Sequence, residues 1–258
     1  MRILFLGNNW LAAQTLKWLR EQNEEIVGLV LHPPHRRKFG NDLLKTAGLP
    51  SAQVFDGSLL EQIQVLESIR ALQPEVGLSV MFGYIVRQRF LDELPLGCLN
   101  VHPSFLPYNR GAYPNVWSIV DGTPAGVTIH YIDSGVDTGD IVAQERIVVE
   151  QIDTGETLYR KLEQCALDLI KRTWPQIRLG MISRTVQDKY QGTLHRVKDT
   201  ERIDEIDLDR TYTARELINV IRARTFGDYP GVFFRVGGRK VYLRLQLSYD
   251  QKPDGSER

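Results

Sequence analysis

Short apolar runs alternate with segments of helical spacing over most of this chain. Met1–Gly7 is an apolar run, Leu11, Leu16 and Leu19 follow it at helical spacing, and Glu25–Leu31 is again rich in strand-forming residues. A repeated order of strand, helix and strand is typical of a sheet with helices on both faces. The pattern therefore predicts an α/β fold with a Rossmann-like, doubly wound and mostly parallel sheet.

The alternation continues to Gly180, and a loop interrupts it. Pro103–Pro114 contains several prolines and should be an irregular loop at the end of a strand, which is where α/β proteins place their chemistry. Asp153 and Thr154 are cap candidates for the long helix expected at Glu156–Leu179. The further expected elements are strands at Val54–Phe55, Glu75–Met81, Leu96–Val101, Gly126–Ile132 and Ile141–Val149, and helices at Leu60–Leu72, Val116–Val120 and Glu156–Leu179.

The sequence becomes more polar after Gly180, and we place a domain boundary near residue 183. Residues 1–183 would form the main domain, and residues 184–258 a small C-terminal region of one helix and one β-hairpin. The hairpin has a free edge that a second subunit could cover, so a homodimer is one expected assembly. The expected elements are a helix at Thr213–Arg222, strands at Val232–Val236 and Lys240–Leu247 around Gly237–Gly238, and a frayed tail at Asp250–Arg258.

Charge and hydropathy exclude several classes of protein. The 258 residues include 32 Lys and Arg against 32 Asp and Glu, so no net positive charge favours a nucleic acid as partner. No stretch approaches the roughly 20 apolar residues that cross a bilayer, and the apolar run Ile3–Leu6 is too short for a signal peptide. We therefore expect a cytoplasmic protein without a membrane partner.

Two polar side chains lie at the end of the predicted strand Leu96–Val101. Asn100 and His102 are two residues apart on extended chain, so both should project from one face, roughly 6.6 Å apart. The later segment Asp133–Asp140 contains three aspartates, one of which could orient the histidine. An amide, an imidazole and a carboxylate can together support acyl transfer to an amine. A structural histidine remains an alternative from this pattern alone.

Two separated segments carry a family resemblance. Residues 99–107 read Leu-Asn-Val-His-Pro-Ser-Phe-Leu-Pro, and residues 126–140 read Gly-Val-Thr-Ile-His-Tyr-Ile-Asp-Ser-Gly-Val-Asp-Thr-Gly-Asp. Together they resemble the folate-dependent formyltransferase family, which includes glycinamide ribonucleotide, methionyl-tRNA and sugar N-formyltransferases. The resemblance covers at least residues 75–170 and makes residues 1–183 the expected catalytic domain.

The resemblance implies catalytic roles for Asn100, His102 and Asp137, with 10-formyltetrahydrofolate as the formyl donor. Asn100 would donate a hydrogen bond to the formyl oxygen. His102 would help to hold the oxyanion and accept the proton of the amine. Asp137 would orient His102 and relay protons toward the leaving nitrogen.

The resemblance also implies a folate site between the segment Val80–Val86 and the loop Asp133–Asp137. Backbone groups there could read the edge of the pterin while apolar side chains cover its faces. His130 matches a histidine of several branches, although it could also be a core histidine. The expected folate-binding residues are Met81, Phe82, Gly83, Tyr84, Ile85, His130, Asp133 and Asp137. No metal is expected, because the histidines are scattered along the chain.

The acceptor implied by resemblance is the amine of a nucleotide-linked amino sugar. The segments Gly7–Trp10, Pro107–Trp117 and Arg222–Gly231 resemble the sugar N-formyltransferase branch. Arginines could meet a pyrophosphate and aromatic rings could stack on a base, although the same residues could instead be structural. The expected substrate-binding residues are Asn8, Asn9, Tyr108, Arg110, Arg222, Phe226 and Tyr229.

Other functions remain as alternatives. The acceptor could be methionyl-tRNA or another small amine, or the chain could be a catalytically silent protein that binds folate or a nucleotide sugar. A nicotinamide dehydrogenase is disfavoured because Gly7-Asn8-Asn9-Trp10 lacks the expected run of glycines, and a metal hydrolase because no ligands cluster.

Overall fold

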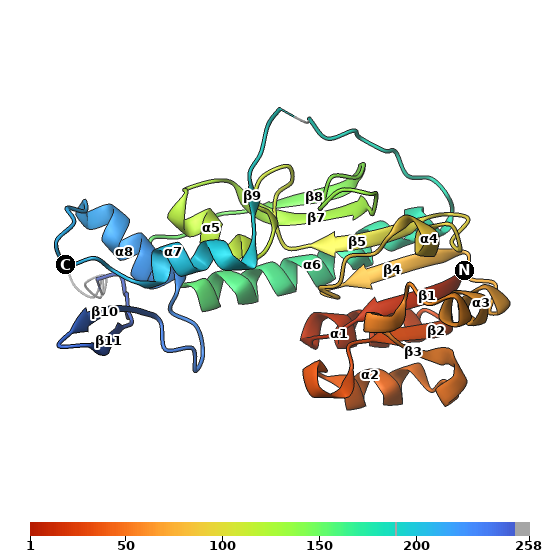
Figure 1. The fold of residues 1–258 in the computed structure, drawn as a ribbon. Helices are drawn as coiled ribbons and strands as arrows, with labels where there is room; N and C mark the ends of the chain where they lie inside the picture. Colours follow the sequence, from red (N-terminus) through yellow and green to blue (C-terminus); the bar gives the residue numbers. More distant parts are fainter. Residues whose placement is uncertain (189, 251–258) are drawn as a thin grey trace, which may run out of the picture.

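A seven-stranded sheet forms the centre of the computed structural model, which describes residues 1–188 and 190–250 (Figure 1). The strand order is β3-β2-β1-β4-β5-β7-β8. The first five strands in this order, from β3 to β5, pair with one another in parallel. β7 is antiparallel to both β5 and β8. The predicted mostly parallel α/β sheet is thereby confirmed. Its strands are β1 Arg2–Gly7, β2 Glu25–Leu31, β3 Val54–Asp56, β4 Val76–Val80, β5 Cys98–His102, β7 Ala125–Tyr131 and β8 Ile141–Ile147.

Helices cover both faces of the sheet. In β1, Ile3 and Phe5 point into one core layer and Leu4 and Leu6 into the other, because successive strand side chains face opposite sides. Burial on both sides explains why this strand reads as an unbroken apolar run. The first layer includes α1 Trp10–Glu21, α2 Gly40–Ala47, α5 Pro114–Val120 and α6 Gly155–Arg178, and the second includes α3 Ile63–Ala71 and α4 Gln88–Leu91.

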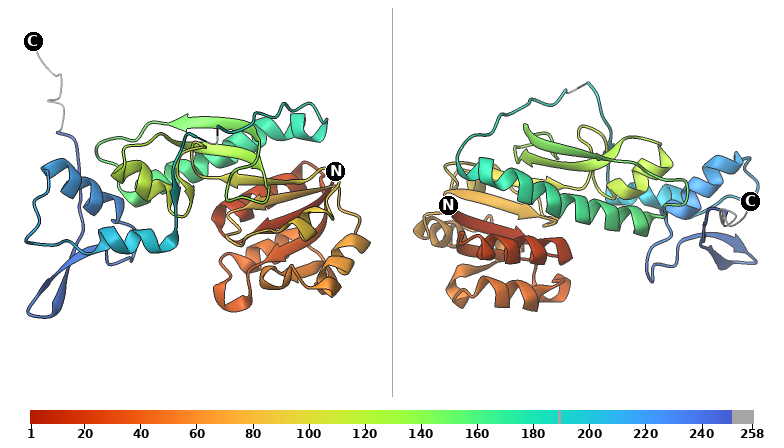
Figure 2. Two further views of the ribbon diagram at one scale, coloured as in Figure 1. Left: turned by 45° about the horizontal axis from the view of Figure 1, so that its top comes forward. Right: turned by 180° about the vertical axis from the view of Figure 1, so that it is seen from behind.

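The long helix α6 begins at a cap that the sequence predicts. The Thr154 hydroxyl accepts a hydrogen bond from the backbone N–H of Thr157, and the Thr157 hydroxyl in turn accepts one from the Thr154 N–H. From this cap the helix runs along the sheet, and its first turns lie beside the C-terminal region (Figure 2). None of the helices in the described part combines the length and apolarity of a membrane span.

The C-terminal region lies at the opposite end of the molecule from β3 (Figure 1). It has a small core of Ile206, Ile221 and Val232. Gly237 and Gly238, with φ of 55° and 78°, form the predicted hairpin turn. The expected frayed tail concerns mainly residues 251–258, which lie outside the described residues. The elements are α7 Glu201–Asp204, α8 Ala214–Ala223, β10 Val232–Val236 and β11 Arg239–Leu243.

A segment that sequence patterns do not predict returns across the sheet between α6 and α7 (Figures 1 and 2). We call residues 185–188 and 190–195 the strap. Its end, β9 Leu194–His195, pairs in parallel with β6 Arg110–Gly111 in the loop after β5. Strands of two residues carry no periodicity, so neither could be predicted. The boundary near residue 183 stays a prediction. Four short 3₁₀ helices complete the described elements: Pro34–Arg36, Ser51–Gln53, Gly57–Leu59 and Val197–Thr200.

Candidate active site

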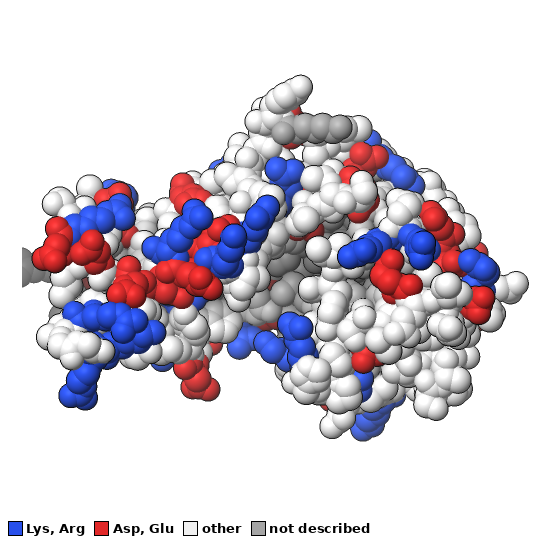
Figure 3. Space-filling view, viewed as in Figure 1, with Lys and Arg blue, Asp and Glu red and all other residues white. Residues whose placement is uncertain are grey.

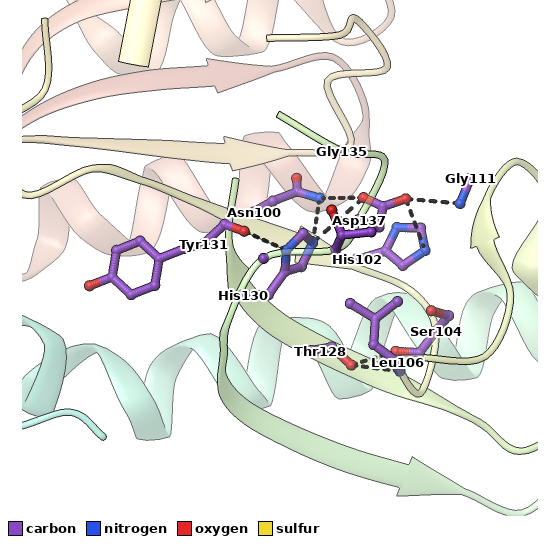
Figure 4. Close-up of polar contacts among 12 residues, drawn as sticks. Asn100, His102, Ser104, Leu106, Gly111, Thr128, His130, Tyr131, Gly135 and Asp137 are labelled. Carbon is purple, nitrogen blue, oxygen red and sulfur yellow. Dashed lines mark hydrogen bonds and ion pairs between the residues drawn. The ribbon is translucent and has the colours of Figure 1, made fainter. Parts of the chain in front are cut away.

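The three residues predicted to be catalytic meet where the parallel and antiparallel parts of the sheet join. β5 carries Asn100 and His102, and the antiparallel β7 places His130 opposite Asn100. The loop between β7 and β8 brings Asp137 to the same place (Figure 4). We call Asn100, His102, Gly111, His130 and Asp137 the Asp137 cluster.

The Asp137 carboxylate lies at the centre of this cluster. Its Oδ2 accepts a hydrogen bond of 2.8 Å from the Gly111 N–H and lies 3.6 Å from His102 Nε2. Its Oδ1 lies 3.5 Å from Asn100 Nδ2 and 3.6 Å from His130 Nε2. Burial acts to raise the pKa of Asp137, but His102, His130 and the Gly111 N–H together hold that pKa well below its usual value. The carboxylate is therefore ionised.

Gly111 was missed by the sequence analysis, although it stands in the proline-rich loop. Its φ is +85°, and a Cβ at this position would lie 2.3 Å from the His195 carbonyl oxygen. Glycine is therefore required for β6 to pair with β9 while it directs its N–H at Asp137.

His102 is buried and has a defined proton position. Its Nε2 lies 3.3 Å from the Asn109 carbonyl oxygen, which can only accept a hydrogen bond. The network thus assigns the proton to Nε2 and leaves the lone pair on Nδ1. Burial lowers the pKa of His102 below its ordinary value, and the charge of Asp137 only partly opposes this. The ring is therefore neutral near pH 7 and can accept a proton.

His130 fixes the orientation of the Asn100 amide. Its Nδ1 lies 2.8 Å from the Tyr131 carbonyl oxygen, so Nδ1 donates and Nε2 is the acceptor in the neutral ring. Nε2 lies 3.2 Å from Asn100 Nδ2, which makes the NH₂ group of Asn100 the donor. The second N–H has only the 3.5 Å contact with Asp137 and is available to a better acceptor.

The predicted folate-binding segment follows β4 at the same edge of the sheet. Val80 pairs with Val101, so the turn after β4 begins at Met81, beside the end of β5. Phe82 is buried and its carbonyl oxygen contacts His32 Nε2, whereas the Ile85 side chain is 77% exposed. Gly83 and Tyr84 lie between these two, and the Tyr84 ring packs on His32 at 4.8 Å.

A cavity of about 420 Å³ opens beside the loop between β7 and β8, which carries Asp137. Among the eight predicted folate-binding residues, Asp133 alone lines it. Its carboxylate also accepts hydrogen bonds from the Gly135 N–H and the Thr138 hydroxyl, which hold the loop between residues 133 and 138. The lining combines apolar side chains, such as Leu91, Leu94 and Ile132, with the charged side chains of Asp133, Asp140 and Arg184.

Both predicted asparagines after β1 have structural partners. The Asn8 side chain accepts from the Lys38 N–H at 2.9 Å, and its amide lies 3.4 Å from the Arg36 carbonyl oxygen. Asn9 caps α1, and its Nδ2 donates to both Tyr159 Oη and Glu163 Oε1 at 3.0 Å. Tyr159 and Glu163 were not predicted.

The remaining predicted substrate residues lie in two places. Arg110 is next to Gly111 and has a buried Nε without a hydrogen-bond partner among the described residues, and Tyr108 precedes it in the same loop. Phe226 packs on Tyr159 at 5.5 Å, which links the C-terminal region to Asn9.

Arg222 and Tyr229 bind groups of the protein itself. Arg222 Nη1 donates to the carbonyl oxygens of Glu150 and Asp153 at 3.0 and 2.8 Å. The Tyr229 hydroxyl accepts from Arg224 and donates to Asp204.

Metal ligands do not gather in the described part of the chain: it holds no group of three or more His, Cys, Asp or Glu side chains arranged for an ion.

Family models match two parts of the chain. The formyl transferase family matches residues 1–173, and a model of the N-formyltransferase dimerization C-terminal domain matches residues 199–249.

Three known proteins illustrate the similarity. A methionyl-tRNA formyltransferase of Geotalea daltonii is 31% identical over 99% of this chain and 83% of its own length. A dTDP-4-amino-4,6-dideoxyglucose formyltransferase of Mycobacterium bovis is 36% identical over 68% of this chain and 75% of its own. The formyltransferase PseJ of Anoxybacillus kamchatkensis, solved with UDP-4,6-dideoxy-4-formamido-L-AltNAc and tetrahydrofolate, aligns with a TM-score of 0.58 and 30% identity over 78% of this chain and 89% of its own.

Proposed function

The chain belongs to the formyl transferase family and is a formyltransferase, and from this premise we propose that it moves a formyl group from 10-formyltetrahydrofolate to the amine of a nucleotide-linked amino sugar. The observation that carries the proposal is the Asp137 cluster, in which one ionised carboxylate lies between a neutral imidazole and a donor amide. This is the set of groups that acyl transfer to an amine requires.

The residues at the edge of the sheet fit the folate donor. Met81–Ile85 follow β4 beside the end of β5, the loop at Asp133–Asp137 follows β7, and Ile85 offers an exposed apolar side chain. Carboxylates and apolar groups line the neighbouring cavity, and a flat pterin with a donor edge needs both. We infer that these segments hold the donor, with His130 behind Asn100. When bound, 10-formyltetrahydrofolate supplies the formyl group at Asn100.

Three side chains of the Asp137 cluster have distinct proposed tasks. Asn100 donates its free N–H to the formyl oxygen, where negative charge develops. His102 accepts at Nδ1 the proton that the attacking amine releases, directly or through water. Asp137 stabilises the protonated His102 and relays a proton to the leaving nitrogen. The reaction needs no covalent bond to the protein.

The choice of a sugar acceptor over tRNA rests on the C-terminal region and on charge. Residues 199–249 match an N-formyltransferase dimerization domain, and this part of the structure consists mainly of the helices α7 and α8 and the hairpin of β10 and β11. On the face seen in Figure 3, Lys and Arg are interspersed with Asp and Glu and form no continuous basic surface. A tRNA ligand needs such a surface to bind its phosphates. The equally similar methionyl-tRNA formyltransferases make tRNA the second candidate acceptor.

We infer nucleotide contacts for Arg110, whose buried Nε is unpaired among the described residues and which adjoins Gly111. A guanidinium here could bind a pyrophosphate close to the reacting amine. Asn9 and Phe226, joined through Tyr159, mark the second place where the substrate could lie.

We also propose a homodimer through residues 199–249. The hairpin exposes Val236, Val241 and Tyr242, which a second copy would cover. Light scattering of the intact protein and of a Val241→Glu variant tests this proposal, because only the variant should be monomeric.

A formyl-transfer assay tests the acceptor. The enzyme would be given 10-formyltetrahydrofolate with dTDP- and UDP-linked amino sugars, glycinamide ribonucleotide and methionyl-tRNA. Transfer to one amino sugar supports the proposal. Transfer to methionyl-tRNA alone would leave the family assignment intact and overturn the proposed acceptor.

A further inference from the structure

We propose that Gln187, on the strap, is a positioning residue for formyl transfer: its side-chain amide holds the backbone that carries Asp137. This inference rests on the proposed function of the Asp137 cluster. Gln187 touches none of the reacting groups, so it acts only through Asp137.

The contacts of Gln187 use its whole donor capacity. Its Nε2 donates to the Asp137 carbonyl oxygen at 3.0 Å and to the Gly139 carbonyl oxygen at 2.7 Å. The side chain is only 7% exposed, so these bonds form away from water. An NH₂ group has two hydrogens, and each holds one of two carbonyls in the same loop. The amide therefore fixes the path of the loop directly at the catalytic carboxylate.

The loop needs such support at Asp137. The residue has φ of +52°, in the left-handed region that costs a non-glycine residue about 1 kcal/mol or more. Within the loop, the Asp133 carboxylate accepts from the Gly135 N–H and the Thr138 hydroxyl, on either side of Asp137. Gln187 adds a hydrogen bond to the carbonyl of Asp137 itself.

Backbone hydrogen bonds attach the strap on both sides of the Asp137 cluster. On one side, Thr185 and Ile141 exchange two backbone hydrogen bonds of 2.9 and 2.8 Å. On the other, Thr193 accepts from the Asn109 N–H through its hydroxyl at 2.8 Å and from the Arg110 N–H through its carbonyl at 3.0 Å.

The strap thereby reaches Asp137 by two routes. Pairing of β9 with β6 orders Gly111, whose N–H binds the carboxylate. Gln187 binds the main chain of the same residue. The distances from the Asp137 carboxylate to His102 and Asn100 therefore depend on one segment outside the sheet.

Stability alone would not favour a glutamine at this position. Gln187 Oε1 is buried and has no hydrogen-bond partner among the described residues. A buried acceptor without a partner costs about 1–3 kcal/mol. Glutamine is present at position 187 despite this cost, as expected if the Asp137 loop needs the two N–H groups at the other end of the amide.

The test compares Gln187→Glu with Gln191→Glu. Both changes convert an amide to a carboxyl on the strap, but the Gln191 side chain is exposed. A carboxylate at 187 cannot donate to the two carbonyls, so we expect kcat to fall about 10²-fold, as misplacement by 1 Å can cause. The KM for each substrate should stay within twofold, and Gln191→Glu should leave both constants within twofold.

A pH series separates positioning from a general loss of structure. When the carboxyl at 187 is protonated, its O–H can donate to one carbonyl again. The ratio of variant to wild-type kcat, measured per folded molecule, should therefore rise as the pH falls, whereas a purely structural defect would change only the folded fraction. An unchanged kcat, or a rise in KM alone, overturns the proposal.

A measurement without an acceptor separates this proposal from the proposed function. If the wild-type protein transfers no formyl group to any amine, the function fails but the positioning remains testable. The ¹⁵N ring signals of His102 and His130 should shift in Gln187→Glu and stay unchanged in Gln191→Glu. Signals that match the wild type in both variants would overturn the role of Gln187.

Discussion

Two buried polar networks in this molecule differ in how completely their hydrogen bonds are satisfied. In the Arg222 network, the guanidinium donates to the Glu150 and Asp153 carbonyls and to the Asn219 side chain, all within 3.0 Å. In the Asp137 cluster, one contact of the carboxylate is short, and those with His102, Asn100 and His130 measure 3.5–3.6 Å.

The difference separates groups that hold the fold from groups that can act on a substrate. Short bonds engage the Nε and Nη1 donors of Arg222 with groups of the protein itself, whereas long contacts leave hydrogen-bonding capacity free. Among the described residues, no short hydrogen bond engages His102 Nδ1 or the second N–H of the Asn100 amide. We therefore expect changes in the Asp137 cluster to reduce activity and changes in the Arg222 network to reduce stability.

The largest effect should come from the Asp137 cluster. Asp137→Asn and His102→Ala should each reduce kcat about 10³-fold, because proton transfer contributes 10²–10⁴-fold. Asp137→Asn should stay folded, since its amide oxygen can still accept from Gly111, and kcat is therefore compared per folded molecule. A variant with near-normal turnover would contradict the assigned roles.

The second effect should appear in the Arg222 network. Arg222→Met leaves two buried carbonyl groups without donors and should reduce the free energy of unfolding by about 3 kcal/mol. The exposed Arg215 on the same helix provides the control Arg215→Met. Urea unfolding measures the stability, and kcat per folded molecule should remain within a few-fold. A raised KM for a nucleotide sugar with unchanged stability would instead favour the substrate contact that the sequence predicts for Arg222.

The sequence predicted the parts of the site that lie on regular elements. β5 and the loop before β8 could be located from their apolar runs and their glycines, which placed Asn100 and His102 on one strand and three aspartates in the loop. The family resemblance then selected Asp137 among those aspartates. Gly111 and Gln187 could not be found. Their bonds to Asp137 span 26 and 50 residues of chain, and no local pattern encodes such pairings.

A pH profile should sharpen the distinction for His102. Its pKa is lowered by burial, so the neutral ring persists below the ordinary histidine value near 6.5. With both substrates saturating, kcat should stay constant as the pH falls through that value and decline only at lower pH. In Asp137→Asn the decline of the residual activity should move lower still, because Asp137 raises the pKa of His102. A decline centred above pH 6.5 would contradict a buried neutral base.

The smallest effect is expected at another buried carboxyl, Glu163, which binds Asn9 outside both networks. Burial raises the pKa of Glu163, whereas the pKa of Asp137 is lowered by its partners. A raised carboxyl pKa means that ionisation costs stability, so this penalty is absent at low pH and grows as the pH rises past the unfolded value near 4.3. Glu163→Gln removes the penalty and should gain stability relative to the wild type between pH 4.5 and 7.5, by less than about 1 kcal/mol.

Asp137→Asn should show the opposite sign, because its ionised form is the one that folding favours. The stabilisation from Asp137 is present above the unfolded value near 3.9 and is lost as the pH falls through its lower folded pKa. Urea midpoints at a series of pH values measure both variants, with the exposed Glu67→Gln on α3 as the control. The same sign for both carboxyls would mean that the Asp137 cluster does not stabilise a negative charge, and the proposed proton transfer through His102 would lose its basis.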